Sequence, residues 1–168
     1  MYYNKNIKNL VFDFKSDVNY ISILIIQILE ILDCYNKKKS FKDFRKLNYI
    51  INFFTNNEDL ELLIKFLNKE RLEKFEMSIL RNIYFKSKIE EETYNTSVII
   101  LVNKKIIGFY KTKEKNNIFL LDNEVINGTI INNEVLEKVK KLNFIKEALY
   151  KWNYDKILEE ISNLEKEV

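Results

Sequence analysis

The chain contains no proline, and its only glycines are Gly108 and Gly128. Phosphate-cradling turns and the strained turns that present a catalytic serine usually depend on glycine. No P-loop or dinucleotide glycine pattern is present. A chain with so few residues that interrupt helices is expected to form continuous helices joined by short polar turns.

Histidine is absent as well, and Cys34 is the single cysteine. The lack of imidazole excludes Ser-His-Asp and Cys-His nucleophile systems and histidine-ligated zinc. It also removes the commonest general base at neutral pH. One thiol can form neither an internal disulfide nor a thiolate cage for a metal, which predicts a reducing compartment. We expect Cys34, near the end of a strongly apolar segment, to be a buried structural thiol.

Targeting and membrane signals are missing from the sequence. The first residues lack the basic-then-apolar pattern of a signal peptide. The most apolar segment, Ile21 to Leu32, is too short to cross a bilayer and contains Gln27 and Glu30. We therefore expect a cytoplasmic protein with no membrane partner.

Carboxylates are the remaining route to catalysis. The nuclease pattern needs Glu-X-Lys on a strand next to another acid, and no Glu-X-Lys occurs in the chain. Glu90, Glu91 and Glu92 are consecutive, and consecutive helix residues point about 100° apart, so they cannot converge on one metal ion. The sequence predicts no catalytic residue, no metal, no cofactor and no small-molecule substrate.

What the chain does contain is enough material for a folded domain. Apolar residues make up 46% of it and aromatic residues 14%, while the charged residues nearly balance at a net charge of +3. Disordered chains are poor in aromatic and β-branched residues, so this composition predicts a continuous core.

Periodicity and capping residues predict mostly helices. We expect a short edge strand at Asn9–Phe14 and a first helix that is capped by Ser16 or Asp17 and runs to about Tyr35. Its polar residues form one narrow stripe, which predicts a central helix packed on several sides; they are Asn19, Ser22, Gln27, Glu30 and Asp33. Further helices are expected at Ser40–Phe54, Asn57–Leu67, Met77–Phe85, Lys88–Val102, Asn132–Leu142, Phe144–Trp152 and Tyr154–Leu164.

Two short apolar runs, Ile106–Lys111 and Ile118–Leu121, flank a polar turn and predict a β-hairpin. A helix followed at once by such a hairpin is the outline of a winged helix. The predicted fold is mainly α with a short β-hairpin: a winged-helix-like core at 1–121, and a C-terminal helical appendage at 122–168 packed on the same domain.

Basic residues gather in two stretches, at 36–46 and 104–115. They are candidates for contact with a nucleic-acid backbone, and the alternative is that they form solvated faces. Against sequence-specific reading of DNA, the helix before the hairpin opens with Glu90, Glu91 and Glu92, which the phosphates would repel. We therefore expect at most weak, non-specific DNA contact. The candidates are Lys37, Lys38, Lys39, Lys42, Arg45, Lys46, Lys111, Lys113 and Lys115.

Large apolar and aromatic residues cluster near the C-terminus. Aromatic residues with a polar group are frequent anchors of protein interfaces. Alternatively, these residues seal the last helices onto the core. The candidates for partner binding are Phe144, Leu149, Tyr150, Trp152 and Tyr154.

Several stretches are similar to the small middle component of bacterial three-component ABC systems, which is related to the accessory subunit of Lamassu-type defence systems. The similar stretches are the apolar helix Ile21–Leu32, Lys46–Phe53, Tyr84–Glu92 running into Asn103–Gly108, and Leu142–Leu158. The resemblance implies a non-enzymatic adaptor with a winged-helix-like core that bridges an SMC- or Rad50-like ABC ATPase and an effector in an antiphage or anti-plasmid complex. A DNA-binding winged-helix regulator and an accessory subunit of a kleisin or condensin-type complex are the alternatives.

Overall fold

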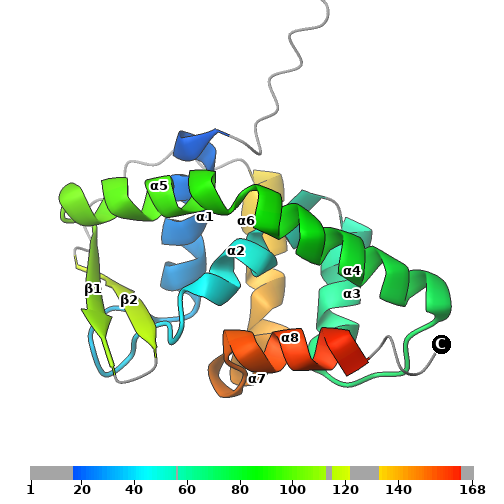
Figure 1. Cartoon of the computed structure of the whole chain (residues 1–168). Helices are drawn as coiled ribbons and strands as arrows, with labels where there is room; N and C mark the ends of the chain where they lie inside the picture. Colours follow the sequence, from blue (N-terminus) through cyan, green and yellow to red (C-terminus); the bar gives the residue numbers. More distant parts are fainter. Residues whose placement is uncertain (1–16, 56, 113–114, 122–132, 164–168) are drawn as a thin grey trace, which may run out of the picture.

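A computed structural model of the chain describes residues 17–55, 57–112, 115–121 and 133–163. The fold is mostly helical with one two-stranded antiparallel sheet, as predicted (Figure 1). The α-helices are α1 (Val18–Ile31), α2 (Arg45–Ile51), α3 (Asn57–Leu67), α4 (Lys74–Ile89), α5 (Glu91–Asn103), α6 (Asn133–Lys141), α7 (Lys146–Lys151) and α8 (Tyr154–Asn163). Short 3₁₀ helices, η2 (Asn52–Thr55) and η4 (Leu142–Ile145), extend α2 and α6, and the strands are β1 (Ile107–Lys111) and β2 (Asn116–Leu120). The predicted strand at Asn9–Phe14 lies outside the described residues.

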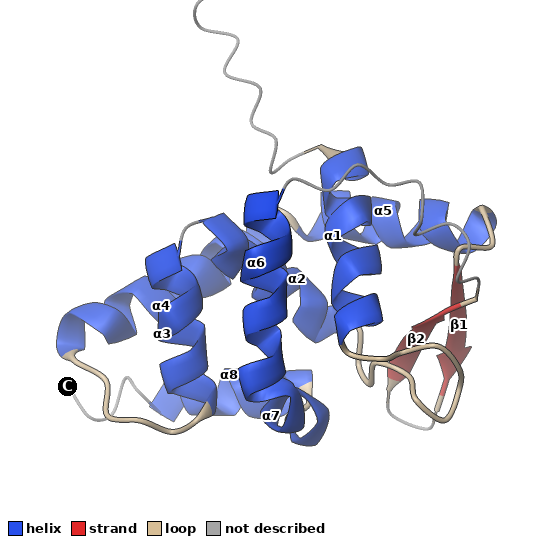
Figure 2. Cartoon of the chain, turned by 180° about the vertical axis from the view of Figure 1, so that it is seen from behind, coloured by secondary structure: helices blue, strands red, loops and turns tan. Residues whose placement is uncertain are grey.

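The first helix, α1, lies in the middle of the molecule, as its wide apolar face predicts. Asp17 caps it by accepting a hydrogen bond from the Asn19 backbone N–H over 2.7 Å. The helix packs against α2, α5, α6 and β2, so most of its surface is covered (Figures 1 and 2). One prediction is wrong. The predicted polar stripe places Gln27 at the protein surface, but in the structure this residue is only 2% exposed.

The segment before α2 differs from the prediction. Ser40 does not cap a helix, because the chain from Ser40 to Phe44 is not helical and α2 begins at Arg45. Phe41 instead pairs with Ile118 of β2, with backbone N–H to O distances of 2.8 Å and 3.2 Å. This pairing requires an extended backbone at Phe41, and Asp43 then turns the chain with a φ of 59°.

Helices α4 and α5 follow one another along one side of the molecule (Figure 1). The expected helix at Met77–Phe85 is longer, because a reciprocal capping box of Glu73 and Glu76 starts α4 at Lys74. The expected break before Lys88 falls instead at Glu90, between α4 and α5. The β-branched end of α5, Val98–Val102, is helical as predicted.

The hairpin pairs β1 with β2 from Ile107↔Leu120 to Lys111↔Asn116. Its two strands agree with the predicted runs, although β2 begins within the segment predicted as a turn. Gly108 lies under the ring of Phe119, since a Cβ atom at position 108 would be 2.4 Å from that ring. The absence of a side chain at Gly108 is therefore what lets Phe119 cover the strand.

The C-terminal helices share one hydrophobic core with the helices before the hairpin. Leu142, Ile145, Leu149 and Trp152 belong to the same buried cluster as residues of α1 to α4. The segment predicted as a helix at Phe144–Trp152 is divided into η4 and α7. The division into parts at 1–121 and 122–168 stays a prediction. Among the described helices, none is both long and apolar enough to span a bilayer.

Candidate partner interface

A loop at residues 36–42, between α1 and α2, is fixed against the hairpin. The Tyr110 hydroxyl donates a hydrogen bond to the Lys37 carbonyl oxygen over 2.8 Å and lies 2.8 Å from the Ser40 hydroxyl oxygen. Within the loop, the side chain of Asn36 accepts from the backbone N–H groups of Lys38 and Lys39 over 3.0 Å and 2.9 Å. The two basic stretches of the sequence therefore meet at one end of the molecule.

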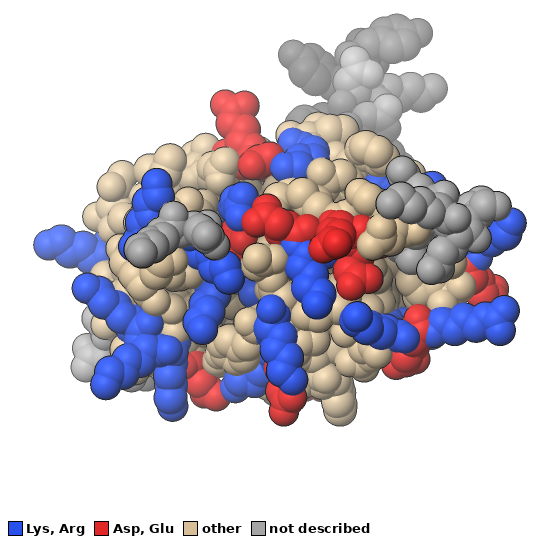
Figure 3. All heavy atoms as spheres, turned by 60° about the horizontal axis from the view of Figure 1, so that its bottom comes forward, with Lys and Arg blue, Asp and Glu red and all other residues tan. Residues whose placement is uncertain are grey.

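We call the lysines of this end the lysine surface: Lys37, Lys38, Lys39, Lys42, Lys111 and Lys115. All are exposed except Lys115, which is half-buried. No ion pair within the described part of the chain involves any of them. Basic side chains are crowded at the hairpin end in the space-filling view (Figure 3). The predicted candidate Lys113 lies outside the described residues.

Arg45 does not belong to this surface. Its guanidinium forms a bidentate ion pair with Asp43, at 2.7 Å and 2.9 Å, and lies 3.5 Å from the carboxylate of Asp155. The guanidinium also stands 5.1 Å from the centre of the Tyr154 ring. The ion pair with Asp43 holds the pKa of Arg45 above its usual value. Arg45 thus serves to join α2 to α8, and its charge is already matched.

Lys46 is buried, which removes it from the candidates for phosphate contact. Its side chain is 1% exposed, and its Nζ donates to the carbonyl oxygens of Leu149 and, over 2.9 Å, of Trp152. The amino group also lies 4.6 Å from the centre of the Phe41 ring. Burial lowers the pKa of Lys46 to about 7. Because two N–H groups suffice for two carbonyls, a neutral amine can satisfy both partners.

The C-terminal aromatic cluster is mostly internal. Leu149, Trp152 and Tyr154 are buried, and the half-buried Tyr150 donates its hydroxyl to the Leu32 carbonyl oxygen over 2.5 Å. Of the five predicted partner-binding residues only Phe144 is exposed, at 77%. These side chains seal α7 and α8 onto the core, which was the alternative interpretation, and they form no common outer surface.

An apolar groove lies between α5 and the hairpin, beside the lysine surface. It has a volume of about 540 Å³. Ile99 and Phe109 at its walls are 58% and 45% exposed, and the Phe44 ring lies 5.9 Å from that of Phe109, edge to face. Its lining residues are Phe44, Asn95, Val98, Ile99, Val102, Asn103 and Phe109. The sequence analysis did not find this groove; the outward position of Phe109 in the hairpin was the one local signal for it.

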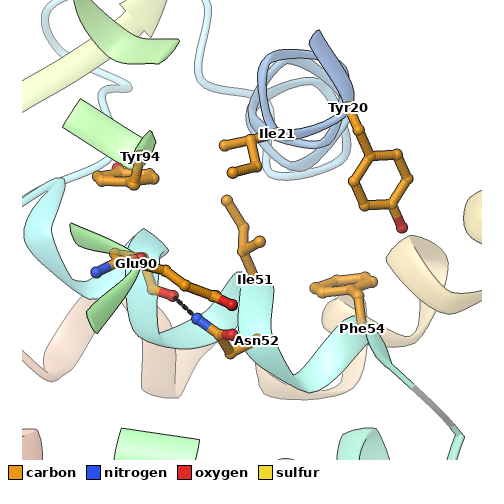
Figure 4. A pocket seen from close by; sticks show the side chains of 8 residues that line it. Tyr20, Ile21, Ile51, Asn52, Phe54, Glu90 and Tyr94 are labelled. Carbon is orange, nitrogen blue, oxygen red and sulfur yellow. Dashed lines mark hydrogen bonds between the residues drawn. The ribbon is translucent and has the colours of Figure 1, made fainter. Parts of the chain in front are cut away.

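A second, smaller pocket of about 20 Å³ lies between α1, α2 and the start of α5. Tyr20, Ile21, Ile51 and Phe54 form its apolar wall, and Glu90 and Asn52 lie together on another side (Figure 4). The Asn52 amide donates to the Asn48 carbonyl oxygen over 3.0 Å. The volume is close to that of one water molecule, so this cavity cannot hold a metabolite.

The remaining candidates for chemistry are the Cys34 thiol and groups of side chains that could bind a metal ion. The Cys34 thiol is buried against α7, 3.6 Å from the Tyr150 hydroxyl, and burial raises its pKa to about 11. A thiol with a raised pKa is a poor nucleophile. Within the described ranges, no three His, Cys, Asp or Glu side chains are grouped so that they could hold a metal ion.

Comparison with known proteins gives no relative: the chain matches no protein-family model, no curated protein and no solved structure.

Proposed function

We propose that this chain is a non-enzymatic adaptor that binds another protein in the apolar groove between α5 and β1. The observation that carries the proposal is the groove itself. It is open, almost wholly apolar, and has exposed Ile99 and Phe109 side chains on its walls. Contiguous exposed apolar surface with a polar rim is typical of protein interaction sites.

A winged-helix-like core is part of this proposal. Helices α1, α2 and α5 lead into the β1–β2 hairpin, and Phe41 adds a third, single-residue pairing to the sheet. This order supports a winged helix in which α5 and the hairpin border the groove. The insertion of α3 and α4 between α2 and α5 lengthens the usual arrangement.

The proposed partners are an SMC- or Rad50-like ABC ATPase and an effector subunit of a bacterial antiphage or anti-plasmid defence complex. This part of the proposal is supported by the resemblance of the sequence to the middle component of three-component ABC systems. The lysine surface beside the groove would allow weak, non-specific contact with DNA held by such an ATPase.

Affinity purification of the tagged chain from its native host tests the proposal. We expect a long coiled-coil ATPase to co-purify, and we expect Ile99→Asp with Phe109→Asp to remove it, since a charge in the groove would be buried by the partner. Leu121→Asp is the matched control, because Leu121 is 53% exposed on the same hairpin but does not line the groove. Co-purification of a kleisin with the ATPase would favour the condensin-type alternative. If no ATPase is recovered, the proposed partner class is wrong.

A DNA-binding regulator is the second candidate, and the lysine surface is the observation that favours it. Six lysines without ion pairs in the described structure lie on one end of the molecule. An electrophoretic shift on duplex DNA separates the two functions. Tight, sequence-dependent binding at physiological salt would favour the regulator, whereas weak binding abolished by salt would favour the adaptor.

A further inference from the structure

Helix α4 exposes a line of residues at a regular spacing. Phe75, Ser78, Asn82, Phe85 and Ile89 are all exposed, and the intervals between them are 3, 4, 3 and 4 residues. The opposite side of the helix is buried through Met77, Leu80, Ile83 and Ser87. We call the five exposed residues the α4 seam.

The apolar members of the α4 seam are unusually open to solvent. Phe75 is 73% exposed, Phe85 is 60% exposed and Ile89 is 82% exposed. One exposed apolar side chain needs no explanation, but three in one line on a helix form a surface that favours a partner. Alternating intervals of 3 and 4 residues are those with which one helix meets another in a coiled coil. The spacing therefore indicates that the partner surface is a helix.

The flanks of the α4 seam are basic. In heptad terms Phe75, Asn82 and Ile89 occupy a positions, so Lys74, Arg81 and Lys88 occupy the neighbouring g positions, and Lys86 follows Phe85 at an e position. Residues at e and g pair with charged residues of the facing helix.

The basic flanks are largely available to a partner. No ion pair with a described residue involves Lys74 or Arg81. Lys86 forms a long ion pair with Glu90, at 3.7 Å. Lys88 lies 3.4 Å from Glu91 and 5.0 Å from the centre of the Tyr154 ring, so Lys88 is the flanking residue most engaged within the chain. Pairs of this kind near the surface contribute little to stability and can be exchanged.

We propose that the α4 seam binds an amphipathic helix of another protein, one with acidic residues beside its apolar seam, in coiled-coil geometry. Asn82 at a central a position would fix the register of the two helices, the use for which a single buried asparagine is best known. Charge complementarity selects the acidic helix, since like charges that face each other across an interface repel and suppress the wrong partner.

Two other occupants fit the charges less well. A second copy of the chain would place the basic flanks Lys74, Arg81 and Lys86 against the same basic flanks. The residues 1–16 of the chain itself contain Lys5, Lys8 and Lys15 against Asp13, so they are basic too.

The α4 seam is separate from the groove of the proposed function. It lies on a different helix and shares no residue with the groove lining. An adaptor that joins two proteins needs two such surfaces, but either surface can fail its test while the other passes.

Two designed peptides provide the probes. Both are about three heptads long with leucine at a and d; one has glutamate at e and g, and the other has lysine there. Binding to the full chain is measured by fluorescence anisotropy at low salt. We expect the acidic peptide to bind at least about tenfold more tightly than the basic one.

Variants locate the binding. Phe85→Ser with Ile89→Ser is expected to weaken binding of the acidic peptide at least about tenfold, because it removes two of the three apolar side chains of the α4 seam, neither of them buried in the core. The matched control Leu121→Ser, at an exposed apolar side chain outside the α4 seam, is expected to leave the affinity unchanged. Lys74→Glu with Arg81→Glu is expected to reverse the preference between the peptides, whereas Lys151→Glu, a charge reversal on α7, is not.

Three results would overturn the proposal. The first is equal affinity for both peptides, and the second is equal loss in the α4 seam variants and their controls. The third is a dimer of the unmodified chain in sedimentation that the Phe85→Ser, Ile89→Ser double variant dissolves, since a second copy would then be the occupant. Circular dichroism melting of each variant establishes that lost binding is not lost folding.

Discussion

Asp43 connects three parts of the chain that are far apart in the sequence. Its buried carboxylate accepts from the Arg45 guanidinium and, over 3.1 Å, from the backbone N–H of Tyr154. Its own backbone N–H donates to the Asn117 side chain over 3.0 Å. A single turn with positive φ therefore joins α2, β2 and α8.

We expect Asp43→Ala to lower the free energy of unfolding by about 2–4 kcal/mol, because it leaves the Tyr154 N–H and the inner side of Arg45 without an acceptor. Alanine also adopts the φ of 59° less readily than aspartate or asparagine. Asp43→Asn keeps the turn and one acceptor and is expected to lose less. Urea unfolding measures both, and equal stability of Asp43→Ala and the unchanged chain would contradict the assigned role.

Gln27 is also buried, but unlike Asp43 it is unpaired: neither its amide nitrogen nor its amide oxygen has a hydrogen-bond partner in the structure. An unpaired buried amide costs free energy that an apolar side chain of similar size does not. We expect Gln27→Leu to raise the free energy of unfolding by about 1–2 kcal/mol. The half-buried Glu30, on the same helix, provides the control Glu30→Leu, for which we expect a smaller change. A thermal melt that shows Gln27→Leu destabilised would rule out this account of Gln27.

At the scale of elements, the sequence predicts what local interactions determine. The cap at Asp17, the helical end of α5 and the hairpin are confirmed because each depends on neighbouring residues. The predicted start of the second helix, at Ser40, was wrong because the backbone of Phe41 pairs with that of Ile118, far along the chain. The predicted end of the fourth helix, at Phe85, was misplaced because no glycine or proline marks the actual boundary at Glu90.

The candidate site follows the same division. The lysines at 37–42 and Lys111 in the hairpin are exposed, as their sequence suggests, but nothing local indicates that Lys46 is buried. Its acceptors, Leu149 and Trp152, lie more than a hundred residues away. The apolar groove was not found from the sequence because Phe44, Val98 and Phe109 come from three separate segments.

Gly108 provides a prediction about the hairpin. We expect Gly108→Val to lower the free energy of unfolding by about 1–3 kcal/mol, because the new side chain must displace the Phe119 ring that lies over the strand. Tyr110→Val, on the same strand, is a control for valine in a strand, although it also removes the hydroxyl contacts to the 36–42 loop. Denaturant unfolding compares them, and no loss in Gly108→Val would show that the ring moves aside freely.

At the scale of the whole molecule, the C-terminal helices are attached to α2 by a buried amine. In the unfolded chain a lysine has a pKa of about 10.4, whereas burial lowers the pKa of Lys46 to about 7. Between these values the unfolded state binds a proton that the folded state does not. The contribution of Lys46 to stability therefore rises as the pH rises through this window, and it is smallest below pH 7.

We expect the free energy of unfolding of the unchanged chain to increase relative to that of Lys46→Met by about 1 kcal/mol per unit between pH 7 and about pH 8.5. The raised pKa of Cys34 lowers the stability of both chains at higher pH, since the thiol ionises first in the unfolded state, and this effect cancels in the difference between them. Lys42→Met, at an exposed lysine, is the control. A difference between Lys46→Met and the unchanged chain that does not vary with pH would contradict the assignment.

The enclosure of Lys46 has a practical consequence for chemical labelling. An amine with a pKa near 7 is about half unprotonated at neutral pH, far more than an exposed lysine, and would react quickly with an acylating reagent. The backbone of Leu149 and Trp152 shields the amine of Lys46 from such a reagent. Its modification must await the lifting of α7 away from α2. The rate of acylation at Lys46, measured by mass spectrometry, therefore reports how often the last helices detach from α2.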